Sequence, residues 1–168
     1  MPASHAAADC VRISVPGAEA MRALGIRLAG LLRPGDLVVL TGPLGAGKTT
    51  LVQGIGSGLG VRGPITSPTF VIARVHRSEH GGPDLVHADA YRLGSRLEVD
   101  DLDLDADVDH SVTVVEWGEG LVEDLTAGHL RITIEWALAG ENADSQGDEP
   151  RLVTLMPHGA RWNAVQLF

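Results

Sequence analysis

The first half of the chain switches between strand-like and helix-like hydrophobic patterns. Apolar and polar residues alternate over residues 11–15, which predicts a short, half-buried strand. Over residues 18–32 the apolar positions recur every three or four residues, the period of an amphipathic helix. Residues 37–40 (Leu-Val-Val-Leu) form a continuous apolar run, which is typical of a strand buried on both faces of a parallel sheet. A Gly-rich loop follows, and then a second predicted helix over about 48–59.

Five further segments in the second half of the chain have strand patterns. Residues 70–75 and 85–88 are close in sequence, and the polar loop between them favours an antiparallel hairpin. Residues 112–115 are apolar or β-branched throughout and predict a second strand buried on both faces. Residues 130–136 alternate as in a sheet with one solvated face, and residues 152–156 are predicted to form the last strand.

Three segments lack such patterns. Residues 1–10 are Ala-rich and without a period, so we expect a disordered N-terminus followed by one domain over 11–168. Residues 98–109 are rich in Asp and Glu and predict a solvated loop or short helix, with an acidic binding face as the alternative. Residues 140–149 are polar and acidic and predict a mobile hairpin loop.

Composition narrows the class of protein. A chain of 168 residues with 44% hydrophobic residues suits one globular domain. Its net charge of −9 disfavours direct, tight binding of nucleic acid, which usually needs a basic face. Cys10 is the only cysteine, so no internal disulfide or cysteine metal cluster forms. Because we find neither a signal peptide nor a membrane span, we expect a cytoplasmic protein with no membrane partner.

One motif carries strong chemical information. Residues 42–49 (Gly-Pro-Leu-Gly-Ala-Gly-Lys-Thr) fit G-x-x-x-x-G-K-[ST], the phosphate-binding P-loop, between a buried strand and a helix. In such a loop, backbone N–H groups face the phosphates, Lys48 reaches the β- and γ-phosphates, and Thr49 places its hydroxyl on Mg²⁺. The predicted nucleotide-binding residues are Gly42, Leu44, Gly45, Ala46, Gly47, Lys48, Thr49 and Thr50.

Hydrolysis or phosphoryl transfer also requires carboxylates near the metal and the attacking group. Asp89 and Glu116 each end a predicted buried strand and are the candidates. Glu135 is a decoy, because Glu135-Trp136 repeats the dipeptide Glu116-Trp117 at the end of another strand. We prefer Glu116, on the premise that a strand beside the P-loop strand is buried on both faces.

Four segments in this order resemble the TsaE family, the small bacterial ATPases of tRNA threonylcarbamoyladenosine synthesis. They are residues 40–50 (LTGPLGAGKTT), 67–70 (SPTF), 87–93 (HADAYRL) and 115–117 (VEW). The resemblance covers about residues 11–135. We therefore expect an α/β, P-loop NTPase-like three-layer sandwich with a mixed, largely parallel sheet. One departure is Pro43, where the family often has an acid.

The resemblance implies a function and a set of roles. It implies hydrolysis of ATP with Mg²⁺ in support of the TsaB–TsaD pair, with tRNA contacted only indirectly. Lys48 would bind phosphate, Thr49 and Glu116 would ligate Mg²⁺, and Asp89 would orient the attacking water. Further switch or partner residues would be Ser67, Thr69, Tyr91, Arg92 and Trp117.

Three alternatives remain at this point. A P-loop small-molecule kinase would need a basic lid, whereas the region after Arg92 is acidic. A GTPase would carry N-K-x-D, which is absent from the chain. A nucleotide-dependent interaction module without significant turnover would share the P-loop and differ only in its rate of hydrolysis.

Overall fold

A computed structural model describes residues 9–66, 73–90, 108–117, 120, 122–137 and 149–168. The α-helices are α1 (Ala18–Ala29) and α2 (Lys48–Leu59), and three 3₁₀ turns are η1 (Val108–His110), η2 (Glu123–Leu125) and η3 (Ala160–Trp162). The strands are β1 (Val11–Val15), β2 (Leu37–Thr41), β3 (Ala73–His76), β4 (Asp84–Asp89), β5 (Ser111–Glu116), β6 (His129–Trp136) and β7 (Arg151–His158).

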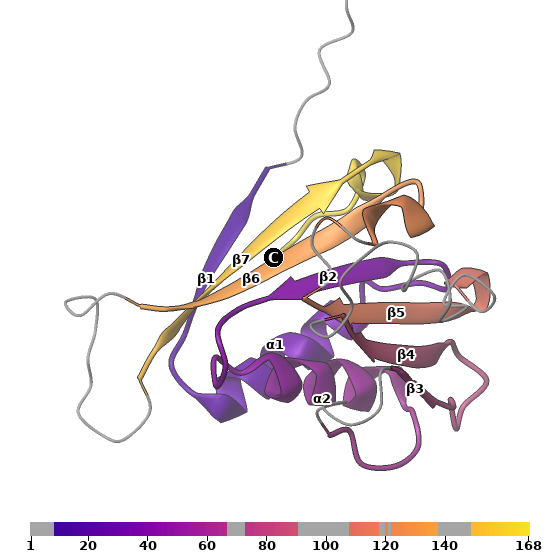
Figure 1. Cartoon of the computed structure of the whole chain (residues 1–168), viewed down its shortest axis with the longest axis horizontal. Helices are drawn as coiled ribbons and strands as arrows, with labels where there is room; N and C mark the ends of the chain where they lie inside the picture. The colour runs from indigo at the N-terminus through magenta and orange to yellow at the C-terminus, as the bar shows by residue number, and fades with distance from the viewer. Residues whose placement is uncertain (1–8, 67–72, 91–107, 118–119, 121, 138–148) are drawn as a thin grey trace, which may run out of the picture.

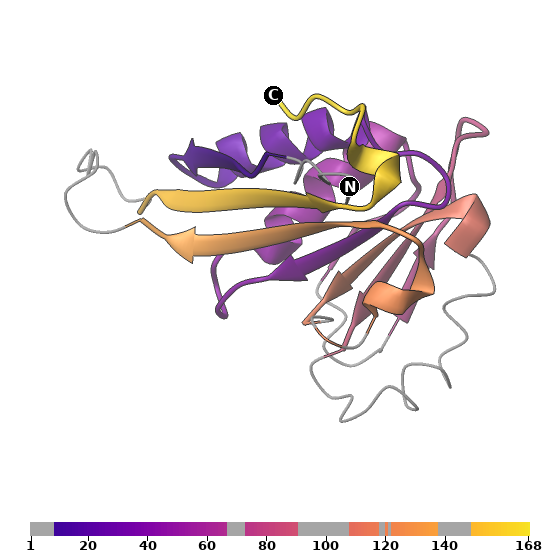
Figure 2. The same ribbon diagram turned by 90° about the horizontal axis from the view of Figure 1, so that it is seen from above.

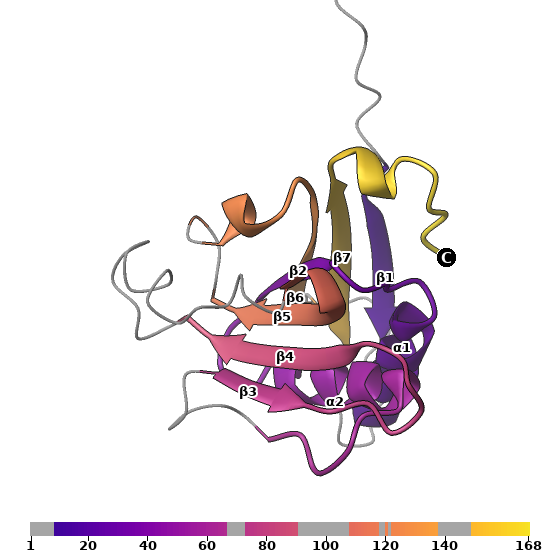
Figure 3. The ribbon, with the colours of Figure 1, turned by 90° about the vertical axis from the view of Figure 1, so that its right-hand side faces the viewer.

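All seven described strands belong to one mixed sheet with the order β1-β7-β6-β2-β5-β4-β3 (Figures 1 and 3). The four strands β6, β2, β5 and β4 run parallel to one another, and the pairings at both edges are antiparallel. The predicted α/β fold with a mixed sheet is confirmed, and the parallel character holds for its centre. In the described residues both α-helices cover one face, so the third layer of the predicted sandwich is not found there. The predicted hairpin is the β3–β4 pair, of which residues 70–72 lie outside the described part.

Both α-helices pack on the same face of the sheet (Figures 1 and 2). The two faces of strand β2 explain why its sequence is apolar throughout. Val38 and Leu40 belong to the large core beneath the helices, whereas Leu37 and Val39 belong to a smaller apolar cluster on the opposite face. In the described part, that second cluster is completed by Val122, with Leu125 of η2 packed against it.

Glycines allow α1 and α2 to approach each other closely. A Cβ atom at Gly54 would lie 2.2 Å from the backbone oxygen of Arg22, and one at Gly25 would lie 2.4 Å from that of Leu51. These contacts explain why a helix with good hydrophobic periodicity contains several glycines, which lower helix propensity. The predicted helix over 18–32 is shorter than expected and ends at Ala29, with Gly30 as its C-cap. No helix in the described ranges is long and apolar enough to span a membrane.

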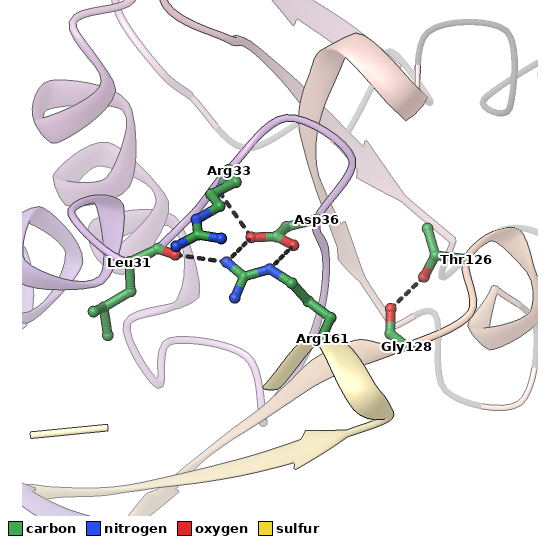
Figure 4. A network of polar contacts seen from close by, with 6 residues as sticks. All are labelled: Leu31, Arg33, Asp36, Thr126, Gly128 and Arg161. Atoms are coloured by element: carbon green, nitrogen blue, oxygen red, sulfur yellow. Dashed lines mark hydrogen bonds and ion pairs between the residues drawn. The ribbon is translucent and has the colours of Figure 1, made fainter. Parts of the chain in front are cut away.

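A partly buried ion pair fastens the C-terminal segment to the turn that precedes β2 (Figure 4). Asp36 is 4% exposed and receives two hydrogen bonds from Arg161, from Nε to Oδ1 at 2.9 Å and from a terminal nitrogen to Oδ2 at 2.8 Å. The same terminal nitrogen donates to the oxygen of Leu31 at 2.9 Å, and the backbone N–H of Arg33 donates to Asp36. This network fixes where the P-loop strand starts.

We expect Arg161→Met to lower the free energy of unfolding by about 3–5 kcal/mol, because it leaves the Asp36 carboxylate buried without its cation. Arg62→Met is the matched control, since Arg62 and Glu79 form an exposed ion pair, which is worth at most about 1 kcal/mol. Urea denaturation of both variants measures the difference. Equal losses would mean that the buried pair is no more important than the exposed one.

Candidate functional site

The loop between β2 and α2 has the backbone geometry of a phosphate cradle. Gly45 and Gly47 have φ values of +79° and +109°, a region that L side chains rarely adopt. Gly47 is the N-cap of α2 and provides no side chain to cap the first turn. The first N–H groups of the helix therefore have no capping side chain, which is the arrangement that binds anions at helix N-termini.

The remaining loop positions divide into buried and exposed residues. Gly42 passes close to β6, and a Cβ atom there would lie 2.7 Å from the oxygen of Ile134. Ala46 is buried, whereas Leu44 at the tip is 94% exposed. Pro43 lacks an N–H for phosphate, but its carbonyl accepts a hydrogen bond from the N–H of Ala46 at 3.1 Å and closes the turn. The loop therefore closes as expected despite the proline.

Lys48 is buried at the first position of α2. Its Nζ donates hydrogen bonds to the oxygens of Gly42 at 2.7 Å and Pro43 at 3.0 Å. Burial lowers the pKa of Lys48 below its usual 10.5, and the nearby carboxylates of Glu116 and Asp89 partly oppose this shift. The ammonium is thus held inside the loop by two neutral carbonyl oxygens. A negatively charged ligand would attract it more strongly than these carbonyls do. Thr49 and Thr50, which follow in the same turn, are half-buried.

Strand register brings the two predicted acids together. Glu116 pairs with Leu40 at the end of β2 and with Asp89 at the end of β4. Side chains alternate between the two faces of a strand, and Val112 and Val114 of β5 lie in the core beneath the helices. Glu116 therefore points to the same face as the P-loop, and Asp89 does so by the same argument from Leu85. Glu116 is 3% exposed and Asp89 is half-buried.

Glu135 occupies a different position, although the premise used to set it aside was wrong. Its strand β6 also pairs with β2, on the side away from β5, and it is not buried on both faces. The two Glu-Trp pairs differ instead in the face of the sheet to which each glutamate points. Ile132 and Ile134 point toward the helices, so Glu135 points to the opposite, solvent-exposed face.

His87 contacts the carboxylate of Glu116, a role that the sequence did not indicate. It lies two residues before Asp89 on the same face of β4, and its ring is fully buried. His87 Nε2 lies 3.1 Å from Glu116 Oε2, while the buried Nδ1 has no hydrogen-bond partner among the residues that the structure describes. A bare lone pair at Nδ1 costs less than an unpaired N–H, which favours the tautomer with the proton on Nε2. In that tautomer His87 donates to Glu116 and fixes its orientation.

Trp117 stands over the ammonium of Lys48. Its φ of +59° is unusual for a bulky residue, and such strain often accompanies functional sites. The backbone N–H of Trp117 donates to the oxygen of Leu40 at 3.1 Å, and Lys48 Nζ lies 4.8 Å from the centre of its ring. The predicted residue Trp117 therefore lies against Lys48, and its role stays a prediction.

Arg151 is a second neighbour that the sequence did not reveal. Its Nε donates to the oxygen of Ala46 in the P-loop at 3.2 Å, across 105 positions of the chain. Its guanidinium carbon lies 3.3 Å from the centre of the Trp136 ring. Through Arg151, the end of β6 and the start of β7 are thereby attached to the phosphate cradle.

The predicted switch or partner residues lie outside the described part of the chain. They are Ser67, Thr69, Tyr91 and Arg92. Their placement beside the cradle stays a prediction.

The donor set suits a cation that takes most of its ligands from elsewhere. Within the described residues, no group of three or more His, Cys, Asp or Glu side chains is arranged to hold a metal ion. Glu116 and Thr49 supply oxygen atoms at the cradle, and Mg²⁺ typically uses one or two carboxylates together with water and substrate phosphates. The residues present therefore fit Mg²⁺ bound with a nucleotide better than Mg²⁺ alone.

Comparison with known proteins gives a consistent result. The family model described as "Threonylcarbamoyl adenosine biosynthesis protein TsaE" matches residues 15–143. The protein named "tRNA threonylcarbamoyladenosine biosynthesis protein TsaE" from Streptomyces coelicolor is 62% identical over 143 residues, covering 84% of this chain and 93% of the relative. The protein of the same name from Bacillus subtilis is 35% identical over 148 residues, covering 88% and 85%.

A solved structure is also similar over nearly the whole chain. The crystal structure of Bacillus subtilis YdiB superposes with a TM-score of 0.69 at 30% sequence identity. The superposition covers 95% of this chain and 92% of that chain. The α/β fold described above is therefore also that of a solved relative.

We expect His87→Leu to lower the free energy of unfolding by about 1–3 kcal/mol, because the Glu116 carboxylate loses its buried donor. His87→Gln keeps an N–H donor near the position of Nε2 and should lose less. Urea denaturation of the two variants tests the contact. A leucine variant as stable as the wild type would show that the contact does not stabilise the site.

Proposed function

The chain belongs to the TsaE family, which acts in tRNA threonylcarbamoyladenosine biosynthesis, and from this premise we propose that it is a Mg²⁺-dependent ATPase. The proposed reaction is hydrolysis of the β–γ phosphoanhydride bond by water. One observation carries the proposal. A P-loop with a buried lysine and two register-paired carboxylates meet on one face, at the same edge of the sheet.

The P-loop residues would bind and orient the triphosphate. Backbone N–H groups of the cradle and the start of α2 would face phosphate oxygens. Lys48 would exchange the carbonyls of Gly42 and Pro43 for phosphate oxygens and offset the charge that develops on them. Trp117 over the ammonium would limit the access of water to it.

The two acids would have separate roles. Glu116 is the more buried, and its orientation is fixed by His87, which suits a ligand of a metal ion. When bound, Mg²⁺ would neutralise negative charge on the phosphates. Asp89 is half-buried beside Glu116, which suits a group that orients the attacking water and accepts its proton.

The proposed partners are TsaB and TsaD, the latter carrying out transfer of the threonylcarbamoyl group in the family. The chain would reset that assembly through ATP hydrolysis. Its net charge of −9 fits a protein that contacts tRNA only indirectly, through a partner. ATP hydrolysis measured with and without purified TsaB–TsaD tests this role, with a large acceleration by the partners expected.

Two alternatives give different results in that assay. A small-molecule kinase would form ADP only when a phosphate acceptor is added. A nucleotide-dependent interaction module would bind ATP but form no ADP, alone or with TsaB–TsaD. Acceleration by TsaB–TsaD without any added acceptor favours the ATPase.

We expect Lys48→Ala to reduce ATP hydrolysis by about a hundredfold or more, because the ammonium stabilises charge in the transition state. Arg62→Ala is the control, since Arg62 is an exposed cation paired with Glu79. Steady-state ADP formation with TsaB–TsaD measures both variants. Full activity of Lys48→Ala would rule out the P-loop as the site of hydrolysis.

Measurements of ATP binding and of single-turnover hydrolysis distinguish the roles of the two acids. Glu116→Gln should weaken Mg²⁺-dependent ATP affinity by about tenfold or more, as expected for a metal ligand. Asp89→Asn should keep or improve ATP affinity and lose most hydrolysis, because it acts mainly in the transition state. Glu135→Gln, on the opposite face of the sheet, is the control and should resemble the wild type. Loss of Mg²⁺-dependent binding in Asp89→Asn, but not in Glu116→Gln, would exchange the two roles.

A further inference from the structure

Trp136 and Arg151 form a pair on the face of the sheet that carries the P-loop. They are the last residue of β6 and the first residue of β7, and they are register partners. Ile134 on β6 and Val153 on β7 lie in the core beneath the helices. Because side chains two positions apart share a face, Trp136 and Arg151 point to that same face.

This Trp136–Arg151 pair is held against the phosphate cradle. The guanidinium of Arg151 stacks on the indole at 3.3 Å from its centre and donates from Nε to the oxygen of Ala46. A terminal nitrogen of the same side chain also donates to the oxygen of Glu149. Trp136 remains 41% exposed, although a tryptophan is among the costliest residues to leave in water.

The order of the strands places the acids and the Trp136–Arg151 pair on opposite sides of the P-loop. The carboxylates lie on β5 and β4, to one side of the P-loop strand β2, and the pair lies on β6 and β7, to the other side. In the proposed function, Lys48, Glu116 and Asp89 act at the terminal end of the phosphate chain. The nucleoside end is then directed away from the acids, toward β6 and β7.

We propose that the Trp136–Arg151 pair is the platform on which the purine base of the nucleotide stacks. The inference rests on the proposed function and adds to it the residues that hold the base. Indole and guanidinium groups are planar and bind the faces of purines by stacking and by cation–π attraction. The hydrogen bond from Arg151 to Ala46 sets the platform at a fixed position relative to the phosphates.

The test compares a ligand that has a base with one that has none. ADP and inorganic tripolyphosphate are titrated, each with Mg²⁺, into the wild-type protein, Trp136→Ala and Trp136→Phe by calorimetry. We expect Trp136→Ala to weaken ADP binding by about tenfold or more and to leave tripolyphosphate binding unchanged. Trp136→Phe keeps an aromatic face and should recover most of the ADP affinity.

Phe168→Ala is the matched control. Phe168 also stacks with an arginine, Arg27, at 4.0 Å, but at the C-terminal end of the chain, and its removal should change neither affinity. Thermal unfolding of each variant, without ligand, identifies any general loss of structure. A merely structural role of Trp136 would weaken both ligands alike or neither, and either result would overturn the platform.

Failure of the platform and failure of the proposed function give different patterns. If the wild type binds neither ligand, or if Lys48→Ala binds both as well as the wild type, the P-loop function fails and the platform with it. If Lys48→Ala loses both ligands while Trp136→Ala keeps both, only the platform fails.

Discussion

The site depends on one constraint, the register of three parallel strands. Leu40, Glu116 and Asp89 are paired across β2, β5 and β4, so the carboxyl ends of these three strands lie side by side. The P-loop leaves β2 one residue after Leu40. A shift of one residue in β5 would turn Glu116 to the opposite face and separate it from Lys48. The backbone hydrogen bonds of the sheet therefore determine where the acids lie relative to the phosphate cradle.

The same constraint places a cation and two acids where solvent is scarce. Burial destabilises the ammonium of Lys48, and Glu116 and Asp89 partly compensate for that cost. Two P-loop carbonyls accept hydrogen bonds from the ammonium, and His87 is hydrogen-bonded to Glu116. A polyphosphate would offer Lys48 a stronger partner than neutral carbonyls do. The fold thus keeps the charged groups of the site in position before any ligand binds.

Local patterns predicted the elements of this site, and long-range pairing decided the details. The apolar run of β2, the glycines of the loop and the start of α2 at Lys48 all followed from neighbouring residues. Glu116 was chosen over Glu135 on a wrong premise, because both strands flank β2, and the two glutamates differ instead in the face of the sheet to which they point. The contacts of His87 and Arg151 could not be predicted, since their partners are 29 and 105 residues away.

Lys48 is the only lysine in the chain, which makes its ammonium directly observable. In protein labelled with ¹³C-lysine, a single Cε signal reports its ionisation and its surroundings. In the free protein we expect this signal to titrate below the usual lysine pKa of 10.5, because the group is buried. Adding Mg²⁺ with a non-hydrolysable ATP analogue should move the signal and raise the pKa, since phosphate charges stabilise the ammonium. A signal unchanged by the analogue at saturating concentration would contradict the assignment of this loop as the site of the triphosphate.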